Sequence, residues 1–591
     1  MVLRQRRLGA TLSNVGRRRG PPAIDSYLSY KEISGGVAST VEEFHDRLRR
    51  YPMQNLVAIC SVFNTRLTKW TGEYNWDFHT QMARESFPPS LANGILATRR
   101  LAFHRHQLLF VIQEALRLCP IVDRPIDEPD LAALGTMLLM ASDHLDSPIP
   151  ERVDTPEAAI QVISSVIPTI EANGLNNYLM KMARSHLMLT RFIEPLRTKS
   201  NFFDVEVLFK GATGLPLDVH EALLVGLLSR FSNLNKIQTS NDPKDFVIPA
   251  TWFQSTSIPV EQLELFLSAV AATPEDLAAK VRQKSPRPND FTLLKDRPLL
   301  RAKDQWLPID MAFLAEKSES GSFWRIHNDA LKTNFEREGF HSFWGGVFEA
   351  YMNWLLHESC KGRANRPNPD PRYEKNPDEQ VCDNIVLCGR EAVLIESKGS
   401  TFSAAGKYGE NVAIFKKEIE EKLVGSKDRP KGVTQLVRAA ENLCAFDNSL
   451  SIPGLDLRDV TTLYPLVITR DDIGSAFGFN AYLNQRFQDL RSKSTTWRTI
   501  TPLFCLSADD VETISPYLSD TPLSAILRAR YRGDKRLMAP MAMTRNKVLE
   551  QRGQRTPAIL LDAIREAARL GNDFLRVKPV GTPNANTTER T

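Results

Sequence analysis

The chain has 591 residues, 42% of them hydrophobic, and 75 lysines and arginines against 70 aspartates and glutamates. This composition excludes a disordered, collagenous or disulfide-built protein and is enough for roughly two to four domains. The net charge of +5 is small for this length, so only local patches can argue for a nucleic-acid partner.

The sequence predicts neither a membrane protein nor a secreted one. No run approaches the roughly 20 apolar residues of a membrane span, and the start of the chain lacks the apolar region of a secretory signal. The seven cysteines are odd in number, scattered, and contain no C-x-x-C pair. We therefore expect a soluble, cytoplasmic protein without membrane contacts.

The beginning of the chain is basic. The first 25 residues contain six arginines, and Asp25 is their only acidic residue. We expect a flexible arm over residues 1–25. The pattern leaves open a transit peptide, an arm that contacts nucleic acid, and a frayed terminus.

Apolar residues recur at helical spacing over residues 26–284, as in the run Leu108, Val111, Ile112 and Ala115. No fixed-period repeat is visible. The pattern predicts a large all-helical domain with a regulatory or recognition role. The motif SPRPND then marks a boundary, after which residues 285–334 are expected to form a connector of short strands at Phe291–Leu294, Pro298–Leu300 and Trp306–Ile309.

A mixed α/β pattern follows over residues 335–520. Apolar positions predict a helix over Phe343–His357, and the polar, proline-rich stretch of residues 366–379 is expected to be a loop. Two apolar runs, Ile385–Leu387 and Ala392–Ile395, come next and predict a β-hairpin.

The register of this hairpin brings charged residues together. Gly389 can supply the positive φ that a two-residue turn of type II′ requires at its first central position. Counting outward from Cys388 and Glu391 then places Asp383 opposite Glu396, with Lys398 on the same face. Two carboxylates and one ammonium are therefore expected at the end of an otherwise apolar hairpin.

Such a cluster indicates metal-assisted phosphodiester hydrolysis. Converging carboxylates repel each other unless a cation compensates, and Mg²⁺, with Mn²⁺ as a substitute, suits oxygen ligands. The cation can activate a water, while a neighbouring lysine orients that water and stabilises the transition state.

At these residues the sequence resembles the PD-(D/E)XK nuclease superfamily. The stretch CDNIVLCGREAVLIESKG matches the core pattern of an Asp at the start of one strand and Glu-x-Lys at the end of the next. The resemblance covers about residues 335–510 and implies a restriction-endonuclease-like fold, a central mixed sheet flanked by helices, C-terminal to the large all-α domain. It also implies later strands near Tyr464–Thr469 and Pro502–Leu506.

The same resemblance implies roles for individual residues. Asp383 and Glu396, with Glu349 from the preceding helix, would hold Mg²⁺. Lys398 would position the water, and Gln435 from the following helix would orient the site. The literal Pro377-Asp378 falls beyond Lys398 in the hairpin register and is expected to lie outside the metal shell.

Residues 521–591 are expected to form a basic helical segment and a tail. Nine basic residues face two acidic ones between residues 528 and 555, whereas residues 558–574 predict an amphipathic helix. The basic stretch is either a surface that tracks a nucleic-acid backbone or a solvated basic face. The candidate nucleic-acid contacts are Arg528, Arg530, Arg532, Lys535 and Arg536.

Together these features predict a Mg²⁺-dependent deoxyribonuclease, which we expect to be an endonuclease. It is expected to act with a protein activator or as a homodimer. DNA is favoured over RNA because most of the resembled superfamily cuts DNA. A role in prokaryotic restriction or antiviral defence is an analogy with nucleases that carry long helical extensions. Two alternatives remain: a catalytically idle nuclease fold that binds nucleic acid or serves as a scaffold, and an RNA-directed nuclease.

Overall fold

The computed structural model describes most of the chain. The described residues are 27–67, 74–122, 130–145, 156–173, 178–231, 246–254, 258–284, 287–302, 305–408, 411–426, 428, 430–445, 452–476, 478–492, 497–529, 552, 555 and 557–574. Within these ranges no helix is long and apolar enough to cross a membrane. All seven cysteines are free and buried.

The described part of the chain is mostly helical. The first helices begin at side chains that cap them: the Thr40 hydroxyl, for example, accepts a hydrogen bond from the Glu43 amide, and the Glu43 carboxylate accepts one from the Thr40 amide. These helices are α1 (Tyr30–Ile33), α2 (Val41–Leu48), α3 (Met53–Leu67), α4 (Trp76–Ser86), α5 (Pro89–Thr98), α6 (Arg105–Leu118), α7 (Leu131–Asp143), α8 (Pro156–Asn173), α9 (Tyr178–Leu187), η1 (Met188–Phe192), η2 (Glu194–Leu196), α10 (Val205–Thr213) and α11 (Leu217–Phe231).

A small four-stranded sheet with strand order β1-β4-β3-β2 follows, surrounded by short helices. The elements of this region are β1 (Ile248–Pro249), α13 (Ala250–Gln254), α14 (Val260–Val270), β2 (Ala271–Ala272), α15 (Pro274–Gln283), α16 (Thr292–Asp296), β3 (Leu299–Ala302), β4 (Gln305–Pro308), α17 (Met311–Glu316), η4 (Lys317–Gly321), α18 (Ser322–Arg325) and η5 (Ile326–Ala330).

Two sequence predictions fail in this region. The expected strand Phe291–Leu294 is largely helix α16, because Asp290 accepts hydrogen bonds from the Thr292 amide and hydroxyl and so starts a helical turn. The region 26–284 is also not purely helical, since it contributes β1 and β2. These two strands pair with β4 and β3 and are too short to leave an alternating pattern.

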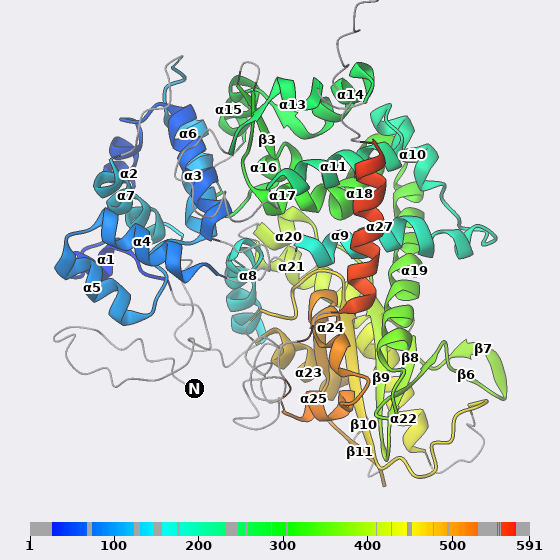
Figure 1. Cartoon of the computed structure of the whole chain (residues 1–591). Coiled ribbons are helices and arrows are strands. Elements are labelled where there is room, and N and C mark those ends of the chain that lie inside the picture. Colours follow the sequence, from blue (N-terminus) through cyan, green and yellow to red (C-terminus); the bar gives the residue numbers. More distant parts are fainter. Residues whose placement is uncertain are drawn as a thin grey trace, which may run out of the picture.

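The C-terminal half contains a six-stranded sheet flanked by helices (Figure 1). Its elements are α19 (Asn334–Ser359), β5 (Arg366–Pro369), β6 (Arg372–Tyr373), β7 (Asn376–Gln380), β8 (Asn384–Cys388), β9 (Glu391–Lys398), α20 (Ala404–Tyr408), α21 (Val412–Ile419), η6 (Glu420–Val424), α22 (Gly432–Cys444), β10 (Thr462–Thr469), α23 (Phe479–Leu490), β11 (Thr499–Ile500), β12 (Phe504–Ser507), α24 (Ala508–Ile514), η7 (Ser515–Tyr517), α25 (Leu523–Ala529) and α27 (Ala558–Phe574).

The order β11-β10-β9-β8-β5, with β12 also pairing with β10, makes this sheet mixed. Strands β5, β8 and β9 are antiparallel neighbours, whereas β10 runs parallel to β9, β11 and β12. The prediction of a central mixed sheet flanked by helices in the C-terminal half is therefore confirmed.

The stretch expected to be a loop, residues 366–379, contains strand instead. Prolines at 367 and 369 argue against a central strand, because proline donates no hydrogen bond. They are accommodated because β5 is the edge of this sheet and, among the described strands, pairs only with β8. The hairpin of β6 and β7 then projects from the sheet (Figure 1).

Side chains on the two faces of this sheet enter different hydrophobic cores. Val393 and Ile395 of β9 belong to what we call the α19 core, which also contains apolar residues of α9, α10, α24 and α27. Ala392 and Leu394 belong to the α22 core, which contains α21, α22 and α23. The α22 core also includes Ile160, Ile163 and Ile167 of α8, and this N-terminal helix packs against α20, α21 and α23 of the C-terminal half.

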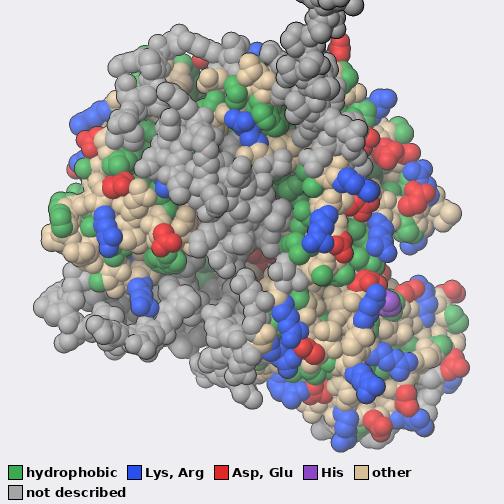
Figure 2. Space-filling view, in the orientation of Figure 1, with side chains coloured by type: hydrophobic (Ala, Val, Ile, Leu, Met, Phe, Trp, Pro, Cys, Tyr) green, Lys and Arg blue, Asp and Glu red, His purple; other side chains and the backbone are tan. Residues whose placement is uncertain are grey.

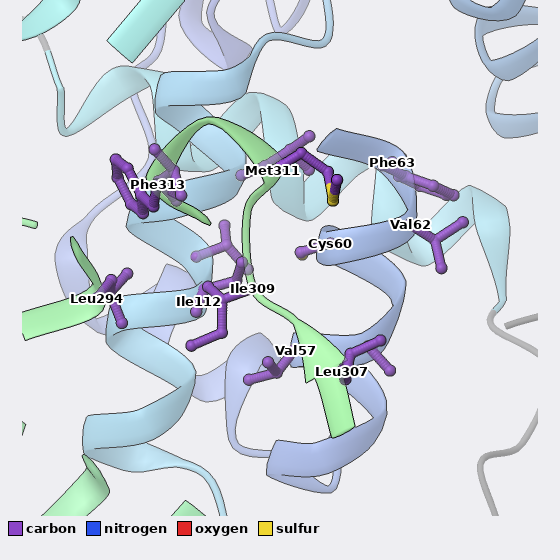
Figure 3. Packing of buried hydrophobic residues seen from close by; sticks show 14 of the residues in the cluster. Val57, Cys60, Val62, Phe63, Ile112, Leu294, Leu307, Ile309, Met311 and Phe313 are labelled. Carbon is purple, nitrogen blue, oxygen red and sulfur yellow. The ribbon is translucent and has the colours of Figure 1, made fainter. Parts of the chain in front are cut away.

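A third group of buried residues, the helical core, joins α2–α7 to the small sheet and to α13–α17. Leu307, Ile309 and Met311 lie between α3, which carries Val57 and Cys60, and α6 (Figure 3). The domain division predicted from the sequence stays a prediction. The cores themselves do not follow its boundary at residue 284, because α8 and α9 contribute to the same cores as residues of the C-terminal half.

The end of the described chain returns to the helical half. Helix α27, red in Figure 1, packs against α9 and α11. It has the bounds that the amphipathic pattern predicts, Ala558–Phe574. On the face shown in Figure 2, lysine and arginine side chains are interspersed with aspartate and glutamate.

Candidate active site

The hairpin has the predicted register. Cys388 pairs with Glu391 and Asn384 with Ile395, so Asp383, which directly precedes β8, comes opposite Glu396. Gly389 has a φ of +66°, as the first central residue of the predicted turn requires. Local sequence was sufficient here because the turn alone sets which residues face each other.

Asp383 is held by the strand that carries the other site residues. Its amide donates to the Ile395 carbonyl at 3.0 Å, and its Oδ2 accepts from the Ser397 amide at 2.6 Å. The neighbouring Asn384 donates to Asn353 of α19 at 2.8 Å. These bonds fix the start of β8 against both β9 and α19.

Glu396 and Lys398 form the centre of the cluster. Lys398 Nζ lies 2.5 Å from Glu396 Oε2 and 3.9 Å from Asp383 Oδ2. The Glu396 side chain is fully buried, and its Oε1 has no hydrogen-bond donor among the described residues. A buried carboxylate oxygen without a donor is costly, so this position is suited to a further cation or donor.

Gln435 reaches the cluster from α22. Its Oε1 accepts hydrogen bonds from Lys398 Nζ at 3.2 Å and from the Gly432 amide at 2.8 Å. The bond from the Gly432 amide, at the start of α22, fixes the side chain, so the glutamine can hold the lysine in place. The structure therefore brings Asp383, Glu396, Lys398 and Gln435 together.

Glu349 approaches from the opposite layer. It belongs to α19, which packs closely on the end of β9: a β-carbon on Gly399 would lie 2.9 Å from the Phe348 β-carbon. Burial and the charge of Asp383 raise the pKa of Glu349 to about 7. The sequence-predicted helix thus places its glutamate within electrostatic reach of the cluster.

The charges of the cluster are unbalanced, with three carboxyl groups near one ammonium. Burial raises the pKa of Glu396 to about 8, and burial also raises the pKa of Asp383 despite Lys398 and the Ser397 amide. Burial alone would lower the pKa of Lys398, but Glu396 and Asp383 outweigh it, so its pKa is raised. Lys398 therefore stays charged, whereas the carboxyl groups have too little positive charge nearby to balance them.

Sequence reasoning missed Asp370. Its amide donates to the Asp383 carbonyl at 3.0 Å, and its charge contributes to the raised pKa values of Asp383 and Glu349. Its φ of +48° is uncommon for a residue other than glycine, and Arg372 holds its carboxylate at 3.0 Å. The dipeptide Pro369-Asp370 was the signal that could have identified it.

Other predicted positions lie elsewhere. Asp378 lies on the exposed strand β7. Arg528 donates to the Tyr464 hydroxyl at 3.1 Å and pairs with Glu391. The remaining candidates for nucleic-acid contact lie outside the described residues, as does the basic arm of residues 1–25: Arg530, Arg532, Lys535 and Arg536.

The number and type of oxygen ligands at the end of β9 fit Mg²⁺. Mg²⁺ is usually held by one or two carboxylates and completes its shell with waters and substrate oxygens. Asp383 and Glu396 supply two carboxylates, and Glu396 Oε1 is the buried oxygen that lacks a donor. Across the described residues no three His, Cys, Asp or Glu side chains already form a metal cage.

Comparison with known proteins assigns no function to this cluster. No protein-family model, no curated protein and no solved structure matches the chain. The cluster itself has three features that bear on its chemistry: the Asp383 carboxylate just before β8 beside the Glu396 carboxylate of β9, an ammonium next to them, and a buried carboxylate oxygen without a donor among the described residues.

Proposed function

We propose that this protein is a Mg²⁺-dependent nuclease that hydrolyses phosphodiester bonds of DNA. The observation that carries the proposal is the meeting of Asp383, Glu396 and Lys398 at the end of β9, with Glu396 Oε1 buried and lacking a donor among the described residues. Clusters with this surplus of buried negative charge are typical of functional sites rather than of structural ion pairs.

The order of elements supports a place in the PD-(D/E)XK superfamily. Helix α19 precedes the antiparallel strands β8 and β9, helix α22 follows them, and β10 returns parallel to β9. Asp383 directly precedes one strand and Glu-x-Lys ends the next, which is the arrangement that the resemblance predicts.

The residues of the cluster have distinct roles in the proposed reaction. Asp383 and Glu396 hold the cation, with Glu349 assisting from α19. The cation supplies positive charge that favours ionisation of the attacking water and offsets charge on the phosphodiester. Because Lys398 stays protonated, it orients the water and stabilises the phosphorane by charge rather than acting as a base. Gln435 holds Lys398 in position.

The biological setting extends the proposal by analogy. A long helical region beside a nuclease-like site is the arrangement of prokaryotic restriction and phage-defence nucleases. In that setting an endonuclease acts with a protein activator or as a homodimer, and the helical half recognises the signal that permits cutting.

The test is cleavage of plasmid DNA, linear DNA and RNA with Mg²⁺ or Mn²⁺. We expect Asp383→Asn and Lys398→Met to reduce DNA cleavage by roughly 100- to 1,000-fold. The matched controls are Asp378→Asn on exposed β7 and Lys417→Met, whose side chain is 73% exposed. Both controls should cut like the wild type.

Other results would lead to different conclusions. Cleavage of RNA alone would favour the RNA-directed alternative. Absence of cleavage, together with absence of Mg²⁺ binding by calorimetry, would contradict the nuclease proposal and favour the scaffold alternative.

A further inference from the structure

A second largely buried lysine, Lys407 of α20, lies between the two halves of the chain. Its side chain is 12% exposed, and its Nζ lies 2.6 Å from Glu171 Oε1 and 2.8 Å from Asp471 Oδ2. Glu171 belongs to α8, in the N-terminal half, whereas Asp471 follows β10 of the C-terminal sheet. One ammonium therefore joins segments 300 positions apart in the sequence.

Both carboxylate oxygens of Glu171 accept hydrogen bonds. Its Oε2 accepts from the Tyr408 hydroxyl and from Lys295 Nζ, the latter at 3.4 Å. Its backbone carbonyl accepts from Arg105 of α6 at 3.2 Å, and Arg105 forms a two-pronged salt bridge with Asp310 at 2.7 Å. The helical core is thus connected to Glu171 through Arg105.

The other side of this network lies next to the candidate active site. Asp471 Oδ2 also accepts from the Phe402 amide at 3.2 Å. Phe402 lies in the loop of residues 399–403, which directly follows Lys398. The preceding Arg470 donates from its amide to the Lys398 carbonyl at 3.1 Å. Asp471 is therefore bonded to both the ammonium from α20 and the loop after the candidate catalytic lysine.

We propose that Glu171 is a positioning residue for the candidate nuclease site. Through Lys407 it holds Asp471 and the loop of residues 399–403, and so determines where the Lys398 ammonium stands. This inference rests on the proposed nuclease function for its effect on activity, but the link between Glu171 and the loop is independent of that function. It makes α8 the element through which the helical half acts on catalysis.

The measured effects of losing Glu171 distinguish a positioning role from a purely stabilising one. If Glu171 only contributed to stability, its loss would lower the melting temperature without changing the folded site. If it positions Lys398, its loss weakens the hold on the loop and misplaces a group of the reaction, which reduces kcat more than it changes KM for DNA.

The test compares Glu171→Gln with Glu114→Gln in the full-length protein. Glu114 is a matched control, since it is buried in the helical core and paired with Arg117 at 2.5 Å but forms no bond to the loop among the described residues. Two readouts are used below the unfolding temperature: amide hydrogen exchange of residues 399–403, and the kcat and KM of DNA cleavage with Mg²⁺.

For Glu171→Gln we expect loop exchange to rise and kcat to fall, each by about tenfold, with KM for DNA nearly unchanged. Glu114→Gln should change neither. Unchanged loop exchange in Glu171→Gln, or the same fall in kcat in both variants, would overturn the inference. If the wild type cuts nothing, the nuclease proposal fails, but loop exchange still decides whether Glu171 holds the loop.

A milder change guards against misfolding of the first variant. Lys407→Arg keeps the positive charge but replaces the compact ammonium by a planar group. We expect the same pattern with a smaller effect, and wild-type exchange in residues 399–403 would count against the inference.

Discussion

Lys398 and Lys407 are both largely buried lysines beside two carboxylates, and they differ in how many of the carboxylate oxygens have hydrogen-bond donors. At Lys407, both side-chain oxygens of Glu171 have donors; although burial opposes it, Lys407 and Lys295 lower the pKa of Glu171. At Lys398, Glu396 Oε1 has no donor among the described residues, and burial raises the pKa of Glu396 to about 8.

The difference separates a network that stabilises the fold from one suited to chemistry. A fully bonded buried cluster holds its elements in one arrangement, and removing a member leaves the others without partners. A cluster with surplus negative charge weakens the folded state until a cation binds. Lysine and carboxylate side chains therefore stabilise the fold around Lys407 and leave charge unbalanced around Lys398. The loop of residues 399–403 joins the two clusters.

The largest expected effect is on stability. Glu171→Gln should lower the free energy of unfolding by about 3 kcal/mol, because it leaves Lys407 and Lys295 short of negative charge. Glu396→Gln should not lower the free energy of unfolding at neutral pH, since it removes a carboxyl group whose raised pKa in the folded state opposes folding there. Calorimetric melting temperatures of both variants check this, with the exposed Glu275→Gln as control.

Equal losses of stability in Glu171→Gln and Glu396→Gln would contradict the comparison. Glu396 would then be a structural partner of Lys398 rather than part of an unsatisfied site.

A smaller effect is expected at Gln435. Gln435→Ala removes the acceptor of Lys398 Nζ and should reduce kcat for DNA cleavage by about tenfold, the value of one hydrogen bond to a charged group. The exposed Gln488→Ala is the control. Wild-type activity in Gln435→Ala would show that Glu396 and Asp383 suffice to position the lysine.

The smallest expected effect is the pH dependence of stability without metal. Glu396 has an ordinary pKa of 4.5 when unfolded and about 8 when folded, so the folded state binds more protons between these values. The stability that Glu396 contributes is fully present below pH 4.5, declines as pH rises from there, and is lost once pH passes 8. The contribution of Glu171, whose pKa is lowered, changes with pH in the opposite direction. Glu396→Gln should flatten this decline, by about 2 °C in melting temperature.

Melting temperature is measured with EDTA present and again with Mg²⁺. Because Mg²⁺ binds the ionised carboxylates, it should raise the melting temperature more at high pH than at low pH. An increase independent of pH would mean that the cation binds somewhere other than Glu396.

Sequence patterns alone determined the hairpin and its charged end. A two-residue turn at Gly389 and the alternation of strand residues are local properties, and together they suffice to place Asp383, Glu396 and Lys398 on one face. The buried stripe of α19 and the ends of α27 follow equally from local periodicity.

Only the tertiary structure decided which distant segments meet. The prolines of β5 conceal an edge strand, whose place depends on β8. Asp370 joins the site only through that pairing, and α8 joins the helices of the C-terminal half through an apolar face that would fit either half of the chain. Periodicity shows that a face is buried, but its partner depends on packing between residues far apart in sequence.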